Sequence, residues 1–112
     1  MTMDAIAMAI ARGLVAADAG VRARSADEVT DVIRALDSGH MAVLAHLLAA
    51  IRVGETDPVA REAQLHALAE LAEWHELPAE VFARTSDIPQ DTVSASETEY
   101  LAYLRDRSPS AR

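Results

Sequence analysis

The chain has 112 residues, 51% apolar and 25% charged, which is enough for one domain with a single hydrophobic core. Its 10 basic residues are all arginines and its acids number 18, so the formal net charge is −8. Because a phosphate backbone needs a basic footprint, we expect no nucleic-acid binding, and the negative charge suits a basic protein partner. The absence of cysteine excludes disulfides, thiol chemistry and cysteine-ligated zinc.

An apolar stretch near the N-terminus, residues 5–11, is too short for a membrane span and is preceded by Asp4 rather than by positive charge. We therefore expect neither a signal peptide nor a membrane anchor, and we interpret the stretch as part of a core helix. The expected location is the cytoplasm.

The composition favours helices throughout the chain. Alanine occupies 24 positions, and leucine, glutamate and arginine are also plentiful; these residues lose least on entering a helix. Alternating β-branched runs and Asn-Gly or Asp-Gly hairpin turns are absent. The sequence therefore predicts an all-α fold, a compact bundle or short stack of five to six helices. We expect one domain over residues 1–107 and a disordered tail at 108–112.

The first half of the chain predicts three helices. Apolar residues recur at intervals of three and four over 2–17, which indicates a first helix. Ser25 and Glu28 have the spacing of a capping box, so a second helix is expected to begin there, with Gly39 closing it. A third helix is expected over 40–52.

The longest predicted helix follows in the middle of the chain. Asp57 can cap it, and Pro58 suits the first helical position because its missing N–H costs nothing there. We expect this fourth helix over 58–75. A break at Pro78 then begins a short fifth helix that ends at Arg84.

A loop and a final helix complete the predicted elements. Residues 86–95 are rich in Asp, Thr, Ser and Pro, which is typical of a loop. Ser96 and Glu99 repeat the capping-box spacing, so a last helix is expected to begin there and to end at about residue 106.

The aromatic residues are few, and some of them must fill the core. Trp74 lies on the side of the fourth helix that carries alanines, and we expect it to be buried there. Tyr100 and Tyr103 are three residues apart, so one can be buried while the other is partly exposed. For Tyr103, core and interface both remain open.

The sequence contains no catalytic motif. Its serines stand at caps, loops or the tail, and its four glycines are isolated, so neither a nucleophile elbow nor a phosphate loop is present. No two histidines are three or four residues apart, the spacing of two ligands on one helix. We expect no enzyme activity, no metal and no other cofactor. One alternative, a metal-dependent enzyme or metal carrier, would use Glu62, His66, Glu70 and Glu73, which share a helical face.

Negative charge is concentrated between Glu55 and Glu80, where seven acids accompany one base, Arg61. Like charges so close together disfavour folding modestly. Two interpretations stay open, a solvated face that only confers solubility and a docking surface for a basic protein. For the docking surface we expect the binding residues to be Glu62, His66, Glu70, Glu73, Glu76 and Tyr103.

The run from Asp57 through Arg61-Glu62-Ala63 into the leucines at 65, 68 and 71 resembles the turn and helix of a HEAT-type repeat. The wider stretch 61–104, with REAQLHALAELAEWHELPAEV and SETEYLAYL, resembles small HEAT-like immunity proteins of bacterial polymorphic toxin systems. The resemblance implies a short HEAT-like stack that binds and neutralises a cognate toxin domain. It transfers no individual binding residue.

The sequence thus predicts a non-enzymatic protein-binding module, an immunity protein that meets its toxin through an acidic helical surface. An alternative is a homodimeric regulatory or scaffold protein that associates through its apolar N-terminal helix.

Overall fold

The computed structural model describes residues 2–109, and no strand occurs among them. Six helices make up the fold, which confirms the predicted all-α class. Two short 3-10 turns, η1 (Ile33–Ala35) and η2 (Gln90–Thr92), join them. The helices are α1 (Met3–Leu14), α2 (Ala19–Asp31), α3 (Ser38–Gly54), α4 (Pro58–Trp74), α5 (Ala79–Ser86) and α6 (Ala95–Arg107). Of the predicted disordered tail, residues 110–112 lie outside the described part of the chain.

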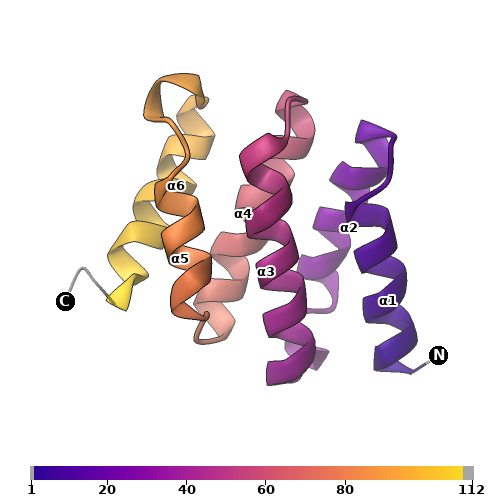
Figure 1. Cartoon of the computed structure of the whole chain (residues 1–112). Coiled ribbons are helices and arrows are strands. Elements are labelled where there is room, and N and C mark those ends of the chain that lie inside the picture. The colour runs from indigo at the N-terminus through magenta and orange to yellow at the C-terminus, as the bar shows by residue number, and fades with distance from the viewer. Residues whose placement is uncertain (1, 110–112) are drawn as a thin grey trace.

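The helices form three consecutive hairpins stacked side by side, in two layers (Figure 1). The layer of α1, α3 and α5 faces the viewer, and the layer of α2, α4 and α6 lies behind it. Helix α4 contacts α3 in front of it and α2 and α6 on its two sides. The resulting slab measures 39 × 31 × 18 Å. This arrangement is a short stack of helical hairpins, one of the two forms that the sequence predicts.

The hydrophobic core lies between the two layers. Leu14, Leu44, Leu68 and Leu104 come from different helices, and each is 0% exposed. Because α4 is flanked on three sides, it buries more of its surface than its neighbours do. Only a narrow side of this helix therefore remains free to carry its charged residues.

The second helix begins earlier than predicted. Asp18 caps α2, its Oδ2 accepting from the Val21 amide at 2.9 Å, so the predicted start at Ser25 is wrong. Ser25 instead lies buried within α2, against α1. A Cβ placed on Gly13 would come within 1.8 Å of the Ser25 Oγ, so the glycine at position 13 lets α1 and α2 pack this closely.

Other predicted boundaries shift for similar reasons. Helix α3 begins at Ser38 with Asp37 as its cap, so Gly39 lies in its first turn and does not close the helix before it. The predicted capping box at Ser96 is also wrong. Ser94 and Glu97 form it two residues earlier. In contrast, the start at Asp57 and Pro58 is confirmed, with Asp57 accepting from the Ala60 amide at 2.9 Å.

Trp74 is 49% exposed, so its predicted place in the core is wrong. It stands in the last turn of α4, beside the point where α2 has given way to η1. The Arg34 guanidinium lies over its ring, 4.4 Å from the ring centroid. Because α2 has ended at this level, no helix of the described chain packs over the Trp74 ring. The Arg34 guanidinium covers the face of the ring instead, in a cation–π contact.

Within residues 2–109, none of the helices has the combination of length and apolarity that crossing a bilayer requires.

Candidate protein-interaction face

Most of the predicted binding residues lie on the side of α4 that faces α6. There the two helices border a shallow groove of about 420 Å³, which we call the α4–α6 groove. Its lining residues are His66, Ala69, Glu70, Glu73, Glu99, Tyr100 and Tyr103. The structure therefore brings four of the six predicted residues together at one place: His66, Glu70, Glu73 and Tyr103.

Tyr100 lines both this groove, with Glu70 and Glu99, and a neighbouring hollow, with Glu62. Burial raises the pKa of its hydroxyl, and the neighbouring carboxylates of Glu62, Glu99 and Glu70 raise it further. Its ring stands 5.3 Å from that of His66, centroid to centroid. Among the residues that the structure describes, no arginine forms an ion pair with any of these three carboxylates. The groove thus offers an aromatic ring bordered by carboxylates with no arginine partner among residues 2–109, and His66 lies 3.5 Å from one of them, Glu70.

Glu73 differs from these carboxylates because its charge is offset within the chain. The Arg107 Nη2 lies 3.1 Å from its Oε2, and the Tyr103 hydroxyl donates to the same oxygen. Burial and this hydrogen bond raise the pKa of Tyr103. Glu73 therefore joins α4 to α6 at this end of the groove, and it is less available to a partner than the sequence suggested.

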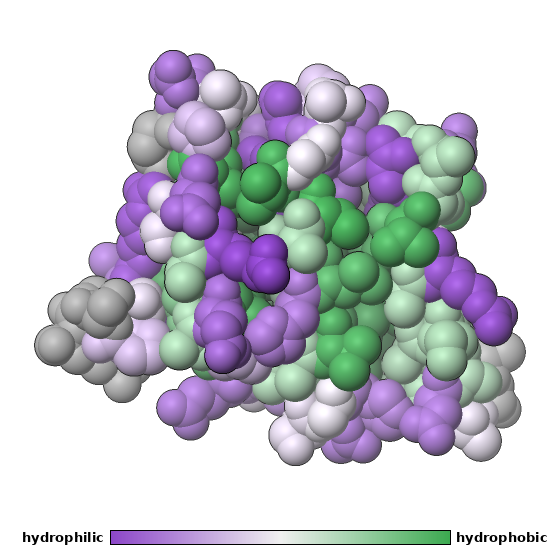
Figure 2. All heavy atoms as spheres, viewed as in Figure 1, coloured by the Kyte–Doolittle hydropathy of each residue, from purple (hydrophilic) through white to green (hydrophobic). Residues whose placement is uncertain are grey.

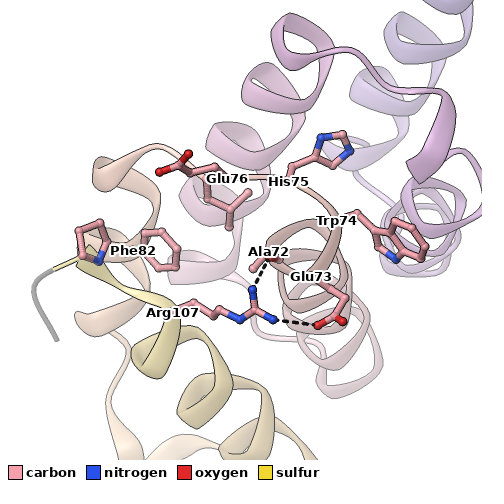
Figure 3. Close-up of a pocket in the computed structure, with 9 residues that line it drawn as sticks. Ala72, Glu73, Trp74, His75, Glu76, Phe82 and Arg107 are labelled. Atoms are coloured by element: carbon pink, nitrogen blue, oxygen red, sulfur yellow. Dashed lines mark hydrogen bonds and ion pairs between the residues drawn. The ribbon is translucent and has the colours of Figure 1, made fainter. Parts of the chain in front are cut away.

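Glu76 does not reach the α4–α6 groove. It lines a separate hollow of about 420 Å³ beyond the end of α4, shown in Figure 3, together with Phe82 and Arg107. In this view Arg107 reaches the Glu73 carboxylate and the Ala72 carbonyl, while the Glu76 side chain points away from them. The predicted grouping of Glu76 with the other acids is therefore not what the structure forms.

Glu62 extends the acidic surface toward α2. It borders a smaller hollow of about 270 Å³ that Asp27 of α2 and Tyr100 of α6 also line. Three residues of this surface, Asp27, Glu99 and Tyr100, were missed by the sequence analysis. All three stand on helices other than α4, which carries the predicted acids, and a helical wheel of one helix carries no signal for its neighbours.

One acid of the predicted negative stretch, Glu55, is turned inward. The Arg22 Nε and Nη2 donate to the two Glu55 carboxylate oxygens at 2.7 and 2.8 Å, and Gln64 donates to Glu55 at 2.8 Å. These partners, Arg22 foremost, lower the pKa of Glu55 to about 2. Glu55 is thus a structural residue that joins the first and second hairpins.

A second buried ion pair joins the second and third hairpins. The Arg52 Nη2 donates to Glu97 Oε2 at 2.6 Å, and the two side chains are 4% and 1% exposed. Arg61 approaches the other Glu97 oxygen at 3.6 Å. These contacts with Arg52 and Arg61 favour Glu97, rather than Glu99, at the third position of α6.

The described residues contain no group of three or more His, Asp or Glu side chains placed to hold a metal ion. His66 and Glu70 do approach each other, at 3.5 Å, but as a pair on one helix.

Comparison of the chain with protein-family models, with curated proteins and with solved structures found no match.

Proposed function

We propose that this protein is a non-enzymatic binding module that docks a basic segment of another protein in the α4–α6 groove. The observation that carries the proposal is the set of three carboxylates, Glu62, Glu70 and Glu99, that border Tyr100 with no arginine partner among residues 2–109. An arginine or lysine of a partner would supply the missing positive charge.

The groove has the chemistry that such a side chain prefers. Carboxylates form charge-assisted hydrogen bonds with guanidinium groups, and an aromatic face attracts a cation placed over it. Tyrosine is also among the residues that contribute most to interface energies. Negative potential around the groove would mainly speed the encounter and orient the partner.

The biological role that we propose follows the resemblance to HEAT-like immunity proteins. In that role the partner is a cognate toxin domain, and the acidic face covers a basic substrate cleft such as that of a nuclease. The chain would then act by occupying the cleft, with no chemistry of its own.

A labelled deca-arginine peptide provides a direct test of the groove. We expect the triple variant Glu62→Gln, Glu70→Gln, Glu99→Gln to bind the peptide about tenfold more weakly in fluorescence anisotropy, since each exposed pair is worth up to about 1 kcal/mol. The matched control Glu80→Gln, Asp87→Asn, Asp91→Asn has the same net charge and should lose about twofold. Equal losses in the two variants would show that binding follows overall charge and would refute the groove.

The identity of the partner is tested separately, by a pull-down from the native host read by mass spectrometry. Recovery of a basic toxin fragment that the wild type retains and the triple variant loses would support the immunity role. Recovery of the same proteins by both would contradict it.

A further inference from the structure

A row of residues runs along α3 on the side away from α4. We call it the α3 seam, and it consists of Gly39, Val43, His46, Ala50 and Val53. They follow one another at intervals of four, three, four and three residues, which is the spacing of a coiled-coil seam. Val43 is 62% and Val53 54% exposed, although both are large apolar side chains. No helix of the described chain covers this side of α3 (Figure 1).

The apolar surface around the seam is continuous. Figure 2 views the layer of α1, α3 and α5, and apolar residues gather there over α3 and toward α1. A shallow groove of about 530 Å³ follows the seam, bordered by Leu47 of α3 and by Arg84 of α5. Met8 of α1 adds another large apolar side chain, 55% exposed. Apolar surface gathered in this way marks an interaction site more often than isolated exposed residues do.

Charge decides what kind of partner fits this face. Helices α1, α3 and α5 together contain three arginines and two acids, whereas α2, α4 and α6 contain five arginines and nine acids. Helix α3 itself contains no Asp or Glu, and the Asp4 carboxylate of α1 contacts the His40 ring. Near the seam, His46 and Glu80 lie 3.9 Å apart. This face therefore lets two chains of net charge −8 meet with their acidic layers pointing away from each other.

We infer that the α3 seam binds a second copy of this chain, with the two α3 helices antiparallel about a two-fold axis near His46. In that arrangement Val53 of each copy lies opposite Gly39 of the other, and Ala42 lies opposite Ala50. The large Val53 then meets the small Gly39, and the two alanines let the helices approach closely between these ends, which is the self-complementarity that a two-fold interface requires. The broad face of the slab measures 39 × 31 Å, which leaves room for the roughly 800 Å² per partner that a standard interface buries.

The inference is independent of the proposed function, because the seam and the α4–α6 groove belong to different layers. A dimer formed through α3 leaves both grooves accessible on its two outer sides. Two linked grooves would bind a partner with two basic segments more tightly than one groove does.

Sedimentation of the full chain from about 1 to 500 µM tests the inference. We expect the 12.0 kDa protein to form a species of twice that mass, and Val43→Glu with Val53→Glu to raise the dimer dissociation constant by roughly tenfold or more. Val59→Glu is the control for an added surface charge, because Val59 is 68% exposed on α4, outside the seam. Circular dichroism verifies that each variant is folded. A monomer at every concentration, or a dimer unaffected by the seam variant, would overturn the inference.

A cross-linking experiment tests the geometry. The chain has no cysteine, so His46→Cys introduces a single thiol next to the expected axis. Under mild oxidation we expect it to form a disulfide-linked dimer readily, whereas Val59→Cys should not. Equal cross-linking of the two variants would contradict the antiparallel α3 pairing.

Discussion

Two groups of carboxylates in this protein differ in a way that the sequence alone does not show. Glu55 and Glu97 are turned inward and are held by Arg22, Arg52 and Arg61. The carboxylates around Tyr100 lie on the surface with no arginine partner among residues 2–109. Arginines that could have neutralised the surface thus hold the three hairpins together from inside. The uncompensated charge of the outer face follows from how the fold is assembled.

The largest expected effect comes from breaking the buried pair at Glu97. Arg52→Met removes the charge while keeping the length of the side chain, and it leaves Glu97 buried with only the more distant Arg61. We expect a loss of about 3–5 kcal/mol in the free energy of unfolding, measured with urea. Adding Glu97→Gln should recover part of the loss, because the amide needs no charged partner and can still accept from the Ser94 amide.

Glu99→Gln, two residues further along α6, is the surface counterpart of that experiment. It should change the free energy of unfolding by less than about 0.5 kcal/mol. Similar effects at positions 97 and 99 would erase the distinction between the two groups of carboxylates.

Lowering the pH should reveal the same difference between buried and surface carboxylates, through the protonation of Glu55. Its pKa falls from 4.5 to about 2 on folding, so the charged form is favoured in the folded state. The stabilisation is complete above about pH 5 and is lost as the pH falls toward 2; by linkage it amounts to about 3 kcal/mol. Urea unfolding between pH 7 and pH 2 measures it.

Glu55→Gln supplies the reference for this titration. The variant should be less stable at pH 7, and its stability should fall less steeply with acid than that of the wild type. An identical slope for both proteins would mean that Glu55 does not carry the acid sensitivity.

The close contact between α1 and α2 predicts a smaller effect. Gly13→Ala places a Cβ against Ser25, and we expect it to destabilise the fold by about 1–3 kcal/mol through overpacking. Gly54→Ala, where no atom lies within 4 Å of the added Cβ, should be neutral or slightly stabilising. Thermal unfolding of both variants measures the difference, and adding Ser25→Gly to Gly13→Ala should restore part of the stability.

The sequence correctly predicted a helix start that depends only on interactions between neighbouring residues. The start of α4 at Asp57 and Pro58 depends only on adjacent residues, and it was predicted correctly. Where two starts were chemically equivalent, as at Ser94 and Ser96, contacts from other helices decided between them. Glu97 has a buried arginine partner and Glu99 does not, and the spacing of the sequence cannot show this.

The candidate site was predicted in part for the same reason. His66 and Glu70 are one turn apart on α4, so their shared face follows from helical geometry. The approach of Tyr100 and Glu99 from α6 depends on the packing of two hairpins, and no pattern within one helix encodes it. The prediction that Trp74 is buried was wrong for the opposite reason. Its side of α4 is covered along most of the helix but not at the last turn, where Trp74 stands.

The most direct test of the central claim, that the α4–α6 groove binds positively charged protein segments, is an NMR titration of the labelled full chain with deca-arginine. We predict saturable shift changes concentrated at residues 62–70 and 99–103, saturating at about tenfold higher peptide concentration in the triple glutamine variant and at about twofold higher concentration in the charge-matched control. Shift changes spread over all the surface acids, including Asp87 and Asp91, would contradict the claim.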